Sequence, residues 1–268
     1  SRRNDMIDAR NFIFVTGFPR GGTSWLRNCI GTHPDVVRVP GELPVMHHKQ
    51  AEKINAACRE AVEPLDAGSL YVSKAPADAP SIDRACRLLP ESRFVFIVRD
   101  PRDVLVSHKR GTKKWMSAGQ NRTSTGILDK LQHYYEGYAR CVDAPNVCMV
   151  RYEDLLFHTR ETTKQICDCV GGTMTEKFDP IDQGAKYGSE HRMSLADAPG
   201  RKNSRRKYAN ETRRYGHLRG EDLEAIRRDI DPRLLDAFRY AFSDARRREV
   251  VGGDAACSAS SPSRWRGH

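Results

Sequence analysis

The chain has 268 residues, 38% of them hydrophobic, which is enough to bury a substantial core in one domain, and no long linker divides it. Its 45 Lys and Arg exceed its 35 Asp and Glu, and the formal charge of +10 favours an anionic ligand, a nucleic acid or a negatively charged surface as partner, although basic surface helices alone would give the same balance. No apolar segment reaches the ~20 residues that span a bilayer, and the first residues lack the apolar centre of a signal peptide, which argues against a membrane span and predicts a cytoplasmic protein.

The eight cysteines do not form a metal-binding pattern. None shows paired C-x-x-C spacing or a histidine at a zinc-finger interval, so we expect no metal site. Several lie in apolar patterns, which predicts buried thiols, while their even number leaves disulfides open. The compartment decides between these states, and the alternative to the cytoplasm is the Golgi or secretory lumen, if an N-terminal anchor preceded Ser1.

The stretch 12–25, which reads FIFVTGFPRGGTSW, predicts a strand, an anion-binding loop and the start of a helix. Aligned to the Walker A frame G-x-x-x-x-G-K-[ST], it supplies Gly17, Gly22 and then Thr23-Ser24. The lysine that would neutralise nucleotide phosphates is missing, and Arg20 is the cation of the loop. The backbone therefore suits a phosphate, but an ordinary ATPase or GTPase is disfavoured.

The next elements alternate between helix and strand. The helix that starts at Thr23 stops at the sequence HPD, and residues 36–48 predict a short strand and a loop that carries Glu42, His47 and His48. A polar helix over 49–62 and a strand over 69–74 follow. That strand ends at Lys74, and the ends of parallel strands are where sites in open sheets gather.

The middle of the chain contains the clearest strand. Residues 93–98, RFVFIV, are apolar enough to be buried on both faces, and they follow a predicted helix over 80–89. The sequence RDPRD at 99–103 predicts a helix start with an early proline and first-turn acids. A helix over 127–142 and a strand over 147–150 complete an α/β pattern with a central parallel sheet.

The last third differs in charge. Residues 186–219 contain ten Lys or Arg against three acids, a net charge of +7, and predict a flexible basic lid. An amphipathic helix follows over 221–242. We therefore expect an N-terminal extension over 1–10, one domain over 11–248 and a disordered tail over 249–268.

At several motifs the sequence resembles the sulfotransferases that use 3′-phosphoadenosine 5′-phosphosulfate (PAPS). GFPRGGTSW at 17–25 resembles their 5′-phosphosulfate loop, and RDPRDVLVS at 99–107 resembles their 3′-phosphate motif. RYEDL at 151–155 also fits, and the resemblance spans about 11–172. It implies a single α/β domain with a P-loop NTPase-like sulfotransferase fold and no metal, because Arg and Lys supply the charge that Mg²⁺ supplies in kinases.

The resemblance also implies the residues that bind PAPS and its product PAP. Arg20 would bind the 5′-phosphosulfate, Arg99 and Ser107 would hold the 3′-phosphate, and Trp25 and Tyr152 would contact adenine. Other residues of this site would be the loop amides and a late basic pair, namely Gly21, Gly22, Thr23, Ser24, Arg201 and Lys202.

Each of these side chains also has a structural interpretation. Trp25 on an apolar helix face could be part of the core, Arg99 could form a surface ion pair, and Tyr152 could cap the core with its hydroxyl bonded. Ser24 could cap the helix, which is compatible with binding.

The catalytic base is assigned from the same resemblance. Cytosolic members carry a Lys-Thr-His element, but here the matching residues are Lys74 and then Ala-Pro, so no histidine base carries over. Tyrosylprotein sulfotransferases instead place a glutamate after the HPD-like helix end, which corresponds to Glu42. Arg20 would neutralise the charge of the leaving phosphate, with Lys74 assisting. The alternative for Glu42 is a loop carboxylate paired with an arginine. His47 and His48 are the other candidates for the base.

The sequence thus predicts transfer of a sulfuryl group from PAPS to a hydroxyl or amine of a small molecule, glycan or peptide. The basic segment favours an anionic acceptor, nucleic acid is not expected as a partner, and no membrane span is predicted. The enzyme alternative is a P-loop kinase of small molecules. The non-enzymatic alternative is a basic module that binds polyanions or nucleic acid, and the segment 186–219 is its main support.

Overall fold

The structure is a computed structural model that describes residues 7–31, 33, 35–63, 65, 70–110, 124–171, 218 and 220–240. Most of the predicted basic lid at 186–219 and the whole predicted tail at 249–268 lie outside the described residues. Within the described part, no helix combines the length and the apolar character needed to cross a membrane.

Five parallel strands form one sheet in the order β2-β3-β1-β4-β5. The strands are β1 (Phe12–Gly17), β2 (Val36–Arg38), β3 (Leu70–Lys74), β4 (Arg93–Val98) and β5 (Val147–Arg151). All six residues of β1 and five of the six in β4 are buried, as expected for central parallel strands covered on both faces. The predicted α/β class and central parallel sheet are confirmed.

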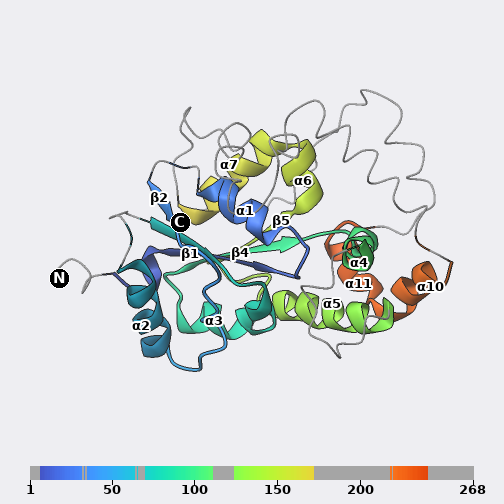
Figure 1. The fold of residues 1–268 in the computed structure, drawn as a ribbon, viewed down its shortest axis with the longest axis horizontal. Helices are drawn as coiled ribbons and strands as arrows, with labels where there is room; N and C mark the ends of the chain where they lie inside the picture. The colour runs from blue at the N-terminus through green and yellow to red at the C-terminus, as the bar shows by residue number, and fades with distance from the viewer. Residues whose placement is uncertain are drawn as a thin grey trace.

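Helices cover both faces of this sheet (Figure 1). One face carries α1 (Thr23–Ile30), α6 (Tyr152–Phe157) and α7 (Thr159–Val170), and the other carries α2 (Ala51–Val62), α3 (Ile82–Leu88) and α5 (Ser124–Ala139). The remaining helices, at the right of the view, pack beside α5: α4 (Pro101–Arg110), α10 (Gly220–Asp229) and α11 (Pro232–Ala237). Two short 3-10 segments are η2 (Ala9–Asn11) and η3 (Pro76–Ser81).

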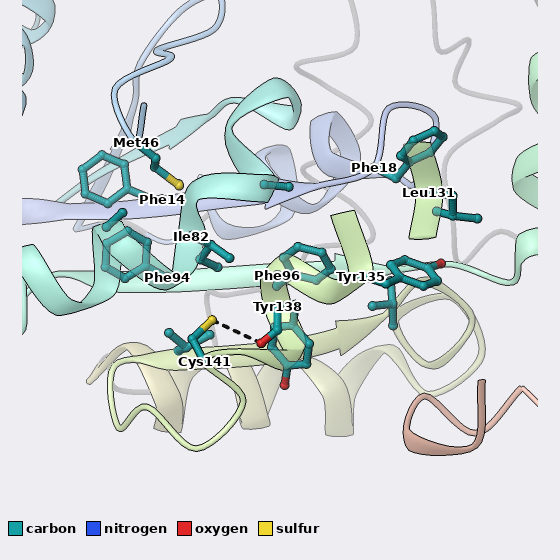
Figure 2. Packing of buried hydrophobic residues seen from close by; sticks show 14 of the residues in the cluster. Phe14, Phe18, Met46, Ile82, Phe94, Phe96, Leu131, Tyr135, Tyr138 and Cys141 are labelled. Carbon is teal, nitrogen blue, oxygen red and sulfur yellow. Dashed lines mark hydrogen bonds between the residues drawn. The ribbon is translucent and has the colours of Figure 1, made fainter. Parts of the chain in front are cut away.

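A row of aromatic rings fills the face of the sheet under α5 (Figure 2). Alternate residues of a strand share a face, so Phe12 and Phe14 of β1 both point this way, with ring centroids 5.5 Å apart. Phe14 stacks on Phe94 of β4 at 5.3 Å, and Phe96 stacks on Tyr138 of α5 at 4.9 Å. This packing fixes α5 against β4, whose carboxyl end leads into the predicted 3′-phosphate motif.

The predicted helix over 221–242 is wrong in one respect: the chain forms two helices, α10 and α11, with a break between them. Pro232 lacks a backbone N–H and disfavours helical geometry at the residue before it, and Asp231 accordingly has φ −59° and ψ 120°. The Asp231 carboxylate then caps α11 by accepting the N–H of Arg233 at 2.8 Å.

The described cysteines divide into one disulfide and five thiols. Cys148 of β5 is bonded to Cys169 of α7, so this disulfide ties the edge strand β5 to the helix layer on one face of the sheet. The thiols are all buried, as their apolar surroundings predict: Cys29, Cys58, Cys86, Cys141 and Cys167.

Candidate active site

The carboxyl ends of the strands place the predicted motifs at one edge of the sheet. Strand β1 pairs with β3 on one side and β4 on the other, and β4 pairs with β5. The segments that leave these strands begin with Phe18, Ala75, Arg99 and Tyr152. Ligands of open parallel sheets bind at this edge, so the fold brings segments far apart in sequence to one candidate site.

The loop after β1 has the backbone geometry of an anion-binding turn. Arg20 and Gly22 have φ angles of 69° and 103°, in the left-handed region. A Cβ at Gly22 would lie 2.5 Å from the ring of Tyr152, so this position requires glycine for space as well as for backbone angle. Helix α1 starts at Thr23, and its first N–H groups and dipole make its N-terminus suited to an anion.

Residues of the two predicted phosphate motifs are in direct contact. Arg20 donates from Nε to Ser107 Oγ at 3.1 Å, and Arg99 donates from Nη1 to the backbone carbonyl of Arg20 at 3.0 Å. Burial and the nearby charge of Arg99 lower the pKa of Arg20. Two guanidinium groups and a hydroxyl therefore converge where an anion would be stabilised.

Two aromatic side chains complete this part of the site. The Arg99 guanidinium lies over the ring of Tyr152, 4.3 Å from its centroid. The rings of Tyr152 and Trp25 form an edge-to-face pair with their centroids 5.2 Å apart. Trp25 is only 7% exposed and belongs to the apolar cluster under α1, α6 and α7. Arg99 also lies 3.8 Å from the buried carboxylate of Asp103. Of the two predicted adenine contacts, Tyr152 thus lies against Arg99, whereas Trp25 is part of the core.

Glu42 and Lys74 form an ion pair at the end of β3. Lys74 Nζ lies 2.6 Å from Glu42 Oε1; the lysine side chain is 6% exposed and that of Glu42 is 46% exposed. The N–H of Leu43 donates to the carbonyl of Lys74 at 3.0 Å, so the backbone fixes this pairing too. The partner of Glu42 is thus Lys74, not the arginine of the alternative interpretation.

Arg27 also fixes the turn that carries Glu42, a role that the sequence did not predict. Its Nη1 donates to the carbonyl of Gly41 at 2.9 Å and to that of Val39 at 3.2 Å, and the residue is only 6% exposed. Because these contacts are set by the tertiary fold, the sequence carried no local signal for this role. Arg27 connects the helix of the phosphate loop to the turn that carries Glu42.

The two candidate histidines lie beside a buried carboxylate. His47 Nδ1 is 3.6 Å from Asp78 Oδ1, and the rings of His47 and His48 are 4.2 Å apart. Asp78 accepts the N–H of Met46 at 2.8 Å; burial raises its pKa, although this hydrogen bond opposes the shift. Asp78, which the sequence did not single out, therefore fixes the loop that follows Glu42.

His108 contacts the phosphate loop from α4. Its Nε2 lies 3.0 Å from the carbonyl of Pro19, which corresponds to a hydrogen bond donated by the Nε2–H tautomer, and burial lowers its pKa. The structure thus brings most predicted site residues to the carboxyl edge of the sheet. Arg201 and Lys202 lie outside the described residues.

Three comparisons relate this chain to known proteins. A profile described as the sulfotransferase family matches residues 45–176. A Danio rerio protein-tyrosine sulfotransferase 1 is 27% identical over 176 residues, 54% of this chain and 49% of the relative. A Caenorhabditis briggsae protein assigned as a protein-tyrosine sulfotransferase is 29% identical over 181 residues, 58% of this chain and 63% of the relative. The chain thus covers about half to three-fifths of these relatives.

Solved structures share the fold. The sulfotransferase domain from the curacin biosynthetic pathway superposes with a TM-score of 0.57 at 15% identity, over 86% of this chain and 98% of that domain. A mouse sulfotransferase complexed with PAP gives 0.55 at 15% identity, over 92% of this chain and 90% of that chain. At such low identity the superpositions establish the fold alone.

Proposed function

We propose that this chain, whose residues 45–176 match the sulfotransferase family profile, transfers the sulfuryl group of PAPS to a hydroxyl or amine of an acceptor. The observation that carries the proposal is the convergence of Arg20, Arg99 and Ser107 beside the N-terminus of α1. This arrangement suits a ligand with anionic groups at both ends. The mouse structure that shares the fold is a complex with PAP, which fits this assignment.

Each end of the donor has its own residues in this proposal. Arg20 and the backbone amides of Gly22, Thr23 and Ser24 bind the 5′-phosphosulfate, while Arg99 and Ser107 bind the 3′-phosphate. The fit is supported by the left-handed backbone of Gly22 at the start of α1 and by the two neighbouring guanidinium groups, which an anion would stabilise. Arg201 and Lys202 are assigned to the same ligand from sequence alone.

The adenine contacts are proposed on the same basis. Tyr152 lies between Arg99 and Trp25, so an adenine bound there would meet one or both rings. Because Trp25 is 7% exposed, we assign the larger contact to Tyr152.

Glu42 is the proposed base. The acceptor oxygen or nitrogen attacks sulfur, the bond from sulfur to the bridging phosphate oxygen breaks, and the acceptor proton passes to Glu42. Lys74 contacts Oε1 and orients the carboxylate, so we assign Oε2 to the proton. Sulfuryl transfer resembles phosphoryl transfer in its loose in-line transition state, and Arg20 is placed to neutralise the charge of the leaving phosphate.

The acceptor class is proposed from the relatives. Both relatives compared above carry the name protein-tyrosine sulfotransferase, so a tyrosyl peptide with acidic neighbours is the first acceptor to test. The surplus of positive charge in the chain agrees with an acidic acceptor.

The experiment that tests the function combines binding and turnover. Calorimetry compares PAP with AMP, which lacks the 3′-phosphate, and labelled sulfate from PAPS is followed into tyrosyl peptides, glycans and small phenols. We expect tighter binding of PAP, loss of that preference in Arg99→Ala, and transfer without Mg²⁺. Equal affinity for PAP and AMP contradicts the proposal. Phosphate transfer that requires Mg²⁺ would instead support a kinase, and salt-sensitive polyanion binding without turnover would support a binding module.

A further inference from the structure

Glu153 and Tyr240, which the proposed mechanism does not use, connect the sheet edge to the end of the described chain. The Glu153 carboxylate accepts the backbone N–H of Asp100 on Oε1 at 3.0 Å and the hydroxyl of Tyr240 on Oε2 at 2.7 Å. Tyr240 is 4% exposed. One carboxylate therefore bridges the segment after β4 and the segment after α11.

The first of these contacts acts on the proposed 3′-phosphate motif. Asp100 is the residue before α4: its carbonyl accepts the N–H of Val104 at 3.0 Å, and its side chain accepts the N–H of Arg102 at 2.8 Å. Arg99 precedes Asp100 directly, and Ser107 lies in α4. A shift of Asp100 would therefore move both proposed phosphate ligands.

The C-terminal segment reaches the same motif by a second route. The hydroxyl of Tyr135 on α5 donates to the carbonyl of Arg99 at 2.5 Å, and the ring of Phe238 packs edge-on against Tyr135 at 4.8 Å. Figure 2 shows Tyr135 at the end of the aromatic row near Leu131. Phe238 and Tyr240 thus support the backbone on both sides of the bond between Arg99 and Asp100.

Local geometry fixes Tyr240 in this position. Arg239 has a φ of 59°, in the left-handed region, and the N–H of Tyr240 donates to the carbonyl of Leu235 at 2.7 Å. The guanidinium of Arg151 lies over the Tyr240 ring, 4.7 Å from its centroid, and donates to the carbonyl of Arg239 at 3.4 Å. The turn after α11 therefore places the Tyr240 hydroxyl within hydrogen-bonding distance of Glu153.

We propose that Glu153 and Tyr240 are positioning residues for the 3′-phosphate, which they serve by holding the Arg99–Ser107 motif in its binding geometry. The inference rests on the proposed function and extends the site to residues 231–240, which lie beyond the part of the chain that matches the family profile. Tyr240, at the end of residues 231–240, would thereby contribute to the preference for PAP over AMP.

The first test is Tyr240→Phe, which removes the hydroxyl and keeps the ring. Calorimetry should find the Kd for PAP raised about tenfold, as expected when a buried acceptor loses its hydrogen-bond donor, and the Kd for AMP unchanged. The matched control is Tyr138→Phe, because Tyr138 is also 4% exposed and contacts Phe238 at 5.7 Å. It should change neither Kd.

The second test separates positioning from simple stability. Glu153→Gln keeps an acceptor for the Asp100 N–H and a partner for the Tyr240 hydroxyl, so it should retain the preference for PAP, whereas Glu153→Ala should lose it. If Glu153→Ala does not fold, Tyr240→Phe decides the matter. An unchanged ratio of the two Kd values in Tyr240→Phe overturns this inference alone. A wild type that binds PAP and AMP equally overturns the proposed function and this inference with it.

Discussion

Arg20 donates a hydrogen bond from Nε to Ser107 Oγ at 3.1 Å, so residues assigned to opposite ends of the donor touch each other. The contact joins the loop after β1 to α4, across 87 residues of sequence. Ser107 accepts in this bond and still has its own hydroxyl hydrogen to donate, so the contact is compatible with a phosphate bound at Ser107.

Ser107→Ala should weaken the binding of PAP more than the binding of AMP. The substitution removes one proposed ligand of the 3′-phosphate, and we expect the Kd for PAP to rise about tenfold by calorimetry while the Kd for AMP stays within error. Ser107→Thr, which keeps the hydroxyl, is the control and should retain most of the preference. An equal loss of affinity for both nucleotides would mean that Ser107 supports the fold rather than the 3′-phosphate.

Glu42→Gln should lower kcat by about 100-fold or more with little change in the KM for PAPS, because general-base catalysis contributes on that scale. Glu63→Gln, an exposed carboxylate at the end of α2, is the matched control and should keep wild-type kinetics. Initial rates with the best acceptor of the panel provide the measurement. Full activity in Glu42→Gln removes this residue as the base.

Arg27→Met should reduce kcat about tenfold and leave the affinity for PAP intact. The substitution keeps much of the buried volume but leaves the carbonyls of Val39 and Gly41 without the guanidinium, which loosens the Glu42 turn. The same loss should cost about 1–3 kcal/mol of unfolding free energy in urea titrations. Arg27→Lys should recover part of both quantities; a lower stability with unchanged kcat would restrict Arg27 to a structural role.

Comparison of Gly22→Ala with Gly41→Ala separates the effect of a steric clash from the effect of a positive φ angle. Both glycines have positive φ, 103° and 68°, but a Cβ at Gly22 would lie 2.5 Å from Tyr152, whereas one at Gly41 meets no atom of the described residues within 4 Å. Gly41→Ala should cost about 1 kcal/mol in chemical denaturation. Gly22→Ala should cost more and abolish PAP binding. Similar effects of the two would mean that the ring of Tyr152 moves aside easily.

Glu153 should make the stability of the protein fall with rising pH. Burial, followed by repulsion from Asp100, raises the pKa of Glu153 to about 7 from an ordinary value of 4.5. The folded state then binds a proton more tightly than the unfolded state, so the stabilisation is complete below pH 4.5 and is lost as the pH rises to 7. The change is at most about 3 kcal/mol. Denaturation of wild type and Glu153→Gln between pH 4.5 and 7.5 measures it, and equal slopes for the two proteins would contradict it.

The local patterns of the chain were sufficient to predict the sheet. The apolar runs of β1 and β4 leave little choice but buried parallel strands, and the glycine loop after β1 predicts its own turn. The break between α10 and α11 was visible in Pro232, yet the continuous apolar spacing around it favoured one helix. Here the proline, not the periodicity, decided the structure.

The candidate site was only partly predictable. Arg99 and Ser107 were paired through motif spacing, and Glu42 and Lys74 were nominated separately before the structure placed them 2.6 Å apart. Arg27 and Tyr240 could not be found in this way, because each acts through a contact set by the tertiary fold. The hydrogen bond from Tyr240 to Glu153 spans 87 residues, and no local pattern encodes it.

The position of Trp25 has a practical, optical consequence. Its indole is 7% exposed and meets the edge of Tyr152, next to the guanidinium of Arg99. Of the three tryptophans in the chain, the other two are Trp115 and Trp265. With both replaced by phenylalanine, the emission of Trp25 alone would report nucleotide binding by fluorescence in real time, without any label.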